Sequence, residues 1–125
     1  MTPDELKQRT RRFAVAIIRL CRSVPRTYDD RVIARQLVRS GTSVGANYNS
    51  ACRARSRPEF VSKLNIVLEE ADETLYWLDL LIESDLVAAT KVQPLKKEAN
   101  ELVSILVASL RTAKSVTQSI AQSEI

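Results

Sequence analysis

The chain has 125 residues, a length that suits a single domain with one core, and its formal net charge is +4. Its composition is 45% hydrophobic but only 5% aromatic, and its two glycines and four prolines leave too little turn material for an all-β fold. No apolar run approaches the roughly 20 residues of a membrane span, and the charged amino terminus lacks a secretory signal, so we expect a cytoplasmic protein.

The first predicted helix covers residues 3–24. Thr2 and Glu5, with Pro3 between them, form the pattern of a capping box with proline at the first helical position. Apolar side chains then recur at helical spacing, and arginines lie on the far side. The apolar stripe consists of Leu6, Phe13, Ile17, Leu20, Cys21 and Val24, and the far side carries Arg11, Arg12, Arg19 and Arg22. Pro25 ends the helix, because a proline inside it would lose a backbone hydrogen bond.

The second predicted helix covers residues 28–55 and begins after the weaker capping pair Thr27 and Asp30. One narrow stripe carries Ile33, Leu37, Ser40, Val44, Tyr48 and Ala51, and the opposite face carries Arg31, Arg35, Arg39, Thr42, Ala46, Asn49, Ser50 and Arg53. Gly41 and Gly45 lie between these faces, and each costs roughly 0.5–1 kcal/mol relative to alanine. We expect close approach of a neighbouring helix to compensate for this cost; a bend in the helix is the alternative.

The third predicted helix covers residues 57–83, with Ser56 and Glu59 as its capping box and Pro58 in its first turn. Its continuous core stripe consists of Phe60, Leu64, Val67, Leu68, Ala71, Leu75, Leu78 and Ile82. A second apolar set lies on the other side of the helix and consists of Ile66, Trp77 and Leu80, with Tyr76 beside them.

Two apolar faces do not suit an outer helix of an isolated bundle, because one of them would face water. We therefore interpret the second face of residues 57–83 as a subunit interface, a setting in which Trp and Tyr are common. Single exposed side chains are the alternative, since these are frequent on protein surfaces. The candidate interface residues are Gly41, Gly45, Ile66, Glu69, Glu73, Tyr76, Trp77 and Leu80.

The fourth predicted helix covers residues 91–114. Thr90 and Gln93 mark its start, and Pro94 falls in its first turn. Its apolar stripe consists of Leu95, Ala99, Leu102, Ile105, Leu106 and Ala113, widened by Val103, Val107 and Leu110. Residues 115–125 are rich in Ser, Thr and Gln and are expected to fray. Four long helices with short links predict an all-α fold, an antiparallel up-down four-helix bundle that forms one domain over residues 1–125.

The charge is distributed unevenly along the chain. Residues 1–57 carry 13 Lys and Arg against 4 Asp and Glu, a balance of +9, whereas residues 58–125 carry 6 against 11, a balance of −5. Such an asymmetry has two physical uses. Either the basic half attracts a polyanion, or the two halves pair with each other within or between subunits.

Little in the sequence supports an enzyme. It contains no histidine for acid–base chemistry near neutral pH or for a Glu-x-x-His metal motif, and a nucleophilic cysteine would lack its histidine partner. Cys21 and Cys52 match no zinc spacing and are interpreted as two small buried thiols, a bridge between helices being the alternative. We therefore expect no catalytic residue, no metal and no cofactor.

Residues 39–81, RSGTSVGANYNSACRARSRPEFVSKLNIVLEEADETLYWLDLL, are similar to a known group of bacterial proteins. The motifs that carry the likeness are Arg39-Ser40, Ser43-Val44 and Asn47, then Arg53 and Arg55, then Glu70-Ala71, Glu73 and Leu75. On these residues the chain resembles the bacterial four-helix-bundle protein family, which includes proteins encoded within intervening sequences of 23S ribosomal RNA genes. Many relatives carry a glutamate three residues after the asparagine, where this chain has Ser50.

The resemblance implies an assembly and a partner. Members of the family are antiparallel four-helix bundles that assemble as ring-shaped homopentamers. A related group accompanies the reverse transcriptase of diversity-generating retroelements, and there the pentamer is a basic barrel that binds nucleic acid and the polymerase. The resemblance implies no catalytic residue.

Two hypotheses of function follow. The first is an oligomeric accessory protein that binds RNA or DNA non-specifically, because arginine pairs bidentately with phosphate. Its candidate residues are Arg11, Arg12, Arg19, Arg22, Arg31, Arg35, Arg39 and Arg53. The second is a structural or interaction scaffold with a protein partner and no nucleic-acid binding. In that case the charge asymmetry is used between subunits, and we expect pairs there between Arg35 or Arg39 and the acids Glu69, Glu70 or Glu73.

Overall fold

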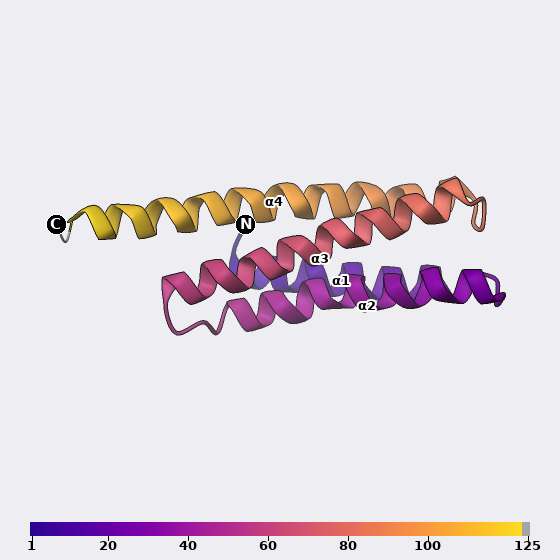
Figure 1. Cartoon of the computed structure of the whole chain (residues 1–125), viewed down its shortest axis with the longest axis horizontal. Helices are drawn as coiled ribbons and strands as arrows, with labels where there is room; N and C mark the ends of the chain where they lie inside the picture. Colours follow the sequence, from indigo (N-terminus) through magenta and orange to yellow (C-terminus); the bar gives the residue numbers. More distant parts are fainter. Residues whose placement is uncertain (124–125) are drawn as a thin grey trace.

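The computed structural model describes the backbone of residues 1–123 and the side chains of residues 1–116. Four helices, α1 (Pro3–Arg22), α2 (Tyr28–Ala51), α3 (Arg57–Glu83) and α4 (Ala89–Ser123), pack into a bundle (Figure 1). No strand occurs in this described part of the chain. Each helix packs against the next one, and α1 also contacts α4. The predicted all-α fold with four helices is thereby confirmed.

The connections lie at the two ends of the bundle. The α1–α2 and α3–α4 connections share one end, and the α2–α3 connection lies at the other (Figure 1). The carboxyl-terminal part of α4 extends past the ends of the other three helices (Figure 1). None of the described helices is both long and apolar enough to cross a membrane.

Side-chain caps explain where the first three helices begin. The Thr2 hydroxyl accepts the N–H of Glu5 at 3.1 Å, and the Glu5 carboxylate accepts the N–H of Thr2 at 3.2 Å. Thr27 caps α2, and Ser56 caps α3 by accepting an N–H at 3.2 Å. Each cap occupies a helical donor that would otherwise lack a partner. The three predicted starts are confirmed.

The end of α2 differs from the prediction. The helix ends at Ala51, four residues before the predicted limit of 55, and Cys52 is its cap residue. The physical reason is the position of α3, which already begins at Arg57 after its Ser56 cap. The intervening residues must reverse the chain, so they cannot continue the helix. Arg53 consequently lies in the α2–α3 connection rather than on the arginine face of α2.

Both ends of α4 also differ from the prediction. The helix begins at Ala89 instead of 91, which leaves Pro94 inside the helix rather than in its first turn. Val92, which is fully buried, holds this first part of the helix against the core. The helix then continues to Ser123 instead of 114, because neither proline nor glycine interrupts residues 115–123. The last two residues of the predicted frayed tail lie outside the described residues.

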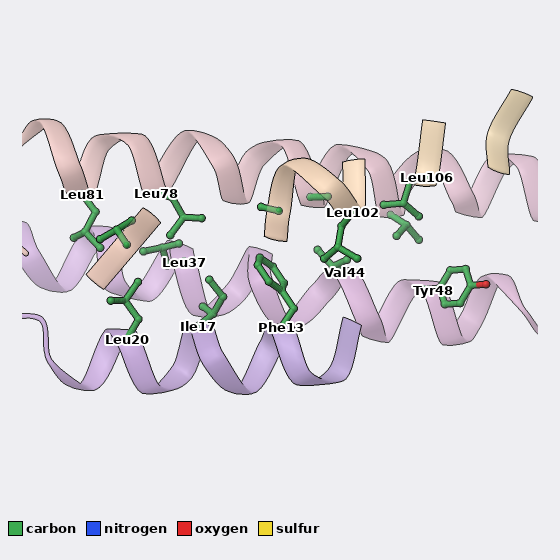
Figure 2. Close-up of a cluster of buried hydrophobic side chains, with 14 of the residues drawn as sticks. Phe13, Ile17, Leu20, Leu37, Val44, Tyr48, Leu78, Leu81, Leu102 and Leu106 are labelled. Atoms are coloured by element: carbon green, nitrogen blue, oxygen red, sulfur yellow. The ribbon is translucent and has the colours of Figure 1, made fainter. Parts of the chain in front are cut away.

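The core follows the predicted stripes of all four helices (Figure 2). Its labelled side chains are Phe13, Ile17 and Leu20 from α1, Leu37, Val44 and Tyr48 from α2, Leu78 and Leu81 from α3, and Leu102 and Leu106 from α4. Each fully buried leucine or isoleucine contributes roughly 1.5–3 kcal/mol of transfer free energy. Four fully buried residues, Thr10, Thr74, Leu81 and Val92, lie outside the predicted stripes. The observed stripes are therefore wider than the periodicity indicates.

The two glycines of α2 allow it to approach α1 closely. A Cβ atom at Gly41 would lie 3.0 Å from side-chain carbons of Ile17, and one at Gly45 would lie 3.2 Å from the hydroxyl of Thr10. The predicted close approach is confirmed. Their assignment to a subunit interface was wrong, because both glycines are buried against α1 of the same chain.

Candidate nucleic-acid interface

The first basic feature is a row of arginines along the exposed side of α1. Arg11, Arg12 and Arg19 line one shallow groove of about 720 Å³, together with Val15 and Ala16. Arg22 follows Arg19 by three residues, so it continues the row on the same side of the helix. Eleven residues separate the first and last arginines of the row, a rise of about 16 Å along the axis.

A second basic feature lies at the end of the bundle where α1 connects to α2. A hollow of about 270 Å³ is lined there by Arg22, Arg26 and Arg31, with Cys21, Val24, Pro25 and Ala34. Because Arg22 belongs to α1 and Arg31 to α2, this hollow joins the basic surfaces of the two helices. Arg35 follows Arg31 by one helical turn and is also exposed. We call Arg11, Arg12, Arg19, Arg22, Arg31 and Arg35 the basic face.

The basic face is not neutralised by acids of its own chain. All six of its arginines are exposed, and none forms an ion pair with another described residue. Asp29, the neighbouring acid on the surface, is exposed, whereas Asp30 is 2% exposed and its carboxylate accepts the hydroxyl of Thr27. The guanidinium groups are therefore accessible to an external anion.

Two of the eight predicted arginines do not belong to this face. Arg39 is paired within the chain: its guanidinium donates to Glu73 and, at 3.3 Å, to Glu70. Arg53 lies in the α2–α3 connection, at the opposite end of the bundle from Arg31 (Figure 1). The structure thus brings six of the predicted residues together and separates two.

One of the predicted interface residues, Glu73, forms an ion pair with Arg39 of its own chain. Glu73 contacts α2 of its own chain, so its carboxylate is engaged within the subunit. Below this pair, the buried hydroxyls of Ser40 and Thr74 lie 3.0 Å apart. Arg39 thus pairs with acids of α3 in its own chain, whereas the scaffold hypothesis expects such pairs between subunits; the pairing connects α2 to α3.

Sequence reasoning missed a second cluster, which connects α1 to α4. Arg9 donates to Glu98 through two nitrogens at 2.8 and 2.5 Å, and to Glu101 at 2.5 Å. The hydrogen bonds to Glu98 raise the pKa of Arg9, although partial burial opposes them. No local pattern announces this cluster, because 89 residues separate Arg9 from Glu98.

The outer face of α3 is apolar in part. Ile66 is 43% exposed and Tyr76 is 57% exposed, while Leu80 is half-buried and Glu69 is exposed. Trp77 packs against the core of its own subunit, and its indole N–H has no hydrogen-bond partner among the described residues. The uncovered apolar surface of α3 is therefore centred on Ile66 and Tyr76 rather than on Trp77.

The two cysteines are free and half-buried. The Cys21 thiol donates to the carbonyl of Ala34 at 3.6 Å, and burial raises its pKa to about 11. At neutral pH it is therefore a thiol rather than a reactive thiolate. Among the described residues, no group of three or more His, Cys, Asp or Glu side chains is placed to hold a metal ion.

These features define a class: a small four-helix bundle protein that presents a basic face on α1 and α2. The sequence matches the 23S rRNA-intervening sequence proteins over residues 4–108, and the chain belongs to this family. The match includes the whole basic face and the outer face of α3.

A solved structure has the same fold. It is a crystal structure of a protein with unknown function from the S23 ribosomal protein family of Bacteroides thetaiotaomicron, with a TM-score of 0.82 and 35% sequence identity. The similarity covers 89% of this chain and 99% of that chain. No match was found among curated proteins.

Proposed function

We propose that this chain is a non-enzymatic, cytoplasmic accessory protein that binds RNA or DNA through contacts between phosphates and the basic face. The observation that carries the proposal is the set of six exposed arginines without an acidic partner in the described chain. Arginine forms bidentate hydrogen bonds with phosphate oxygens. Contacts of this kind give affinity without reading sequence.

The proposal includes an assembly. Antiparallel bundles of this chain form a ring-shaped homo-oligomer, a homopentamer according to the family resemblance, which extends to the accessory proteins of diversity-generating retroelements. The uncovered apolar side chains of α3 support such an assembly, because a second subunit would remove them from water. The basic faces of several subunits would then act on one polyanion, which raises the effective affinity.

A scaffold that binds only a protein partner is the competing function. That hypothesis expects Arg35 or Arg39 to form ion pairs with Glu69, Glu70 or Glu73 of another subunit. Arg39 alone among the eight predicted arginines has such pairs within the described chain, and both are with its own α3. The six arginines of the basic face are accessible in the single chain, and this accessibility supports a polyanion as the partner.

The test is a binding titration of the full chain against RNA and DNA at several salt concentrations. The affinity should fall steeply as salt rises, because each phosphate contact releases a bound counterion. The triple variant Arg11→Gln/Arg12→Gln/Arg19→Gln should weaken binding to all sequences, and its salt slope should be smaller by about 2 to 3.

The matched control removes three exposed positive charges outside the basic face, in the variant Arg57→Gln/Lys91→Gln/Lys97→Gln. Its net charge equals that of the first variant, so a general effect of charge would weaken both equally. We expect the control to bind almost as the parent does. Absence of binding at low salt by the parent protein would remove the proposed function.

A further inference from the structure

An exposed aromatic side chain stands at the edge of the basic face. Tyr28 is the first residue of α2 and is 82% exposed, more than any other large hydrophobic side chain that the structure describes. It has no part in the core cluster. Most of its ring is therefore accessible to a ligand.

That surface combines apolar and cationic groups in one stripe. Arg31, Val32 and Arg35 follow Tyr28 by three, four and seven residues, so the four side chains share one side of α2. Val32 is 45% exposed, and the two arginines are exposed and have no ion pair in the described chain. The hollow lined by Arg22, Arg26 and Arg31 lies at the same corner of the bundle.

We propose that this corner, formed by Tyr28, Val32 and the surrounding arginines Arg22, Arg26, Arg31 and Arg35, binds single-stranded nucleic acid and stacks an unpaired base on Tyr28. The inference rests on the proposed function and specifies its substrate class. Single-strand binding sites characteristically combine a positively charged surface with an aromatic platform. The face of a base is available for stacking when the base is unpaired, as in loops, bulges and strand ends.

Asp29 provides an independent check, because its exposed carboxylate follows Tyr28 directly and repels a phosphate held there. The buried carboxylate of Asp30, which accepts a hydrogen bond from Thr27, is directed away from solvent. Replacing Asp29 by Asn should therefore increase the affinity for a single strand. A site elsewhere on the molecule would respond much less.

The experiment measures binding of the full chain to a short single strand and to a blunt duplex of the same sequence, both at low salt. Tyr28→Ala should weaken binding of the single strand by about 5- to 100-fold and leave duplex binding within about twofold. Tyr28→Phe should restore the affinity, since it keeps the ring. Tyr76→Ala is the matched control, because it removes the exposed aromatic side chain of α3.

A fluorescent base analogue in the single strand reports stacking directly. Its emission should change on binding to the parent chain and to Tyr28→Phe, but not on binding to Tyr28→Ala. If Tyr28→Ala binds single strands as the parent does, the stacking site is overturned while the proposed function stands, and the corner is left as a surface for a protein. If the parent binds neither strand nor duplex, the proposed function itself fails.

Discussion

At the scale of single residues, the glycines of α2 are required by space rather than by backbone conformation. Neither of them has a positive φ. What differs between them is the neighbour that a Cβ would meet: the branched carbons of fully buried Ile17 at Gly41, and the hydroxyl of Thr10 at Gly45. An isoleucine held on all sides cannot move without disturbing the core.

We therefore predict that alanine substitutions at Gly41 and Gly45 have different effects on the free energy of unfolding. Alanine gains about 1 kcal/mol of helix propensity at either position, but overpacking at Ile17 costs about 1–3 kcal/mol. Gly41→Ala should lower the free energy of unfolding, and Gly45→Ala should change it little or raise it. Urea denaturation monitored by circular dichroism measures both. A Gly41→Ala chain more stable than the parent would contradict the packing argument.

At the scale of elements, two polar interactions connect α2 and α3 at the same level of the bundle. Arg39 pairs with Glu70 and Glu73 at the surface, and the hydroxyls of Ser40 and Thr74 meet beneath them. Exposed ion pairs contribute about 0.2–1 kcal/mol, whereas an unpartnered buried polar group costs about 1–3 kcal/mol. The inner contact should therefore dominate.

The buried hydroxyl contact and the surface ion pair should therefore differ in their contributions to the free energy of unfolding. Thr74→Val should lower the free energy of unfolding by about 1–3 kcal/mol, because it leaves the buried Ser40 hydroxyl without this partner. Arg39→Gln should cost less, about 0.2–1 kcal/mol, and its effect should shrink as salt is added. Denaturation at two salt concentrations separates the two. A loss of unfolding free energy that is larger in Arg39→Gln than in Thr74→Val, and that does not change with salt, would show that the surface ion pair contributes more than the buried contact.

The elements were predictable where their signals are local. The starts of α1, α2 and α3 depend on side chains within three residues of the cap, so the sequence alone identifies them. Helix ends were less predictable. α2 ends without glycine or proline, and α3 ends before Asp85, a non-glycine residue at φ 58°. Such ends depend on where the next helix packs, which is tertiary information.

The candidate site was predictable only in its composition. The pattern of α1 and α2 identified the arginines and their exposure, but not which of them meet. Arg22 and Arg31 come together because the α1–α2 connection reverses the chain. Arg39 forms ion pairs with acids more than 30 residues away in the sequence, so it is not part of the basic face. Tyr28 was missed because a tyrosine beside a helix cap has no periodic signal; its role depends on the exposed arginines around it.

At the scale of the whole molecule, the proposed assembly can be tested on the outer face of α3. Ile66 and Tyr76 leave apolar side chains uncovered on α3 of the single chain, and Val15 of α1 and Val32 of α2 are exposed to a similar extent, at 41% and 45%. If subunits associate through α3, the full chain should have a mass in solution several times its 14.0 kDa.

Ile66→Gln/Tyr76→Gln should then yield monomers with unchanged helix content, because neither side chain belongs to the core cluster. The control Val15→Gln/Val32→Gln should keep the parent mass. Sedimentation at micromolar concentration measures all three; a monomeric parent, or dissociation in the control alone, would show that α3 is not the subunit contact.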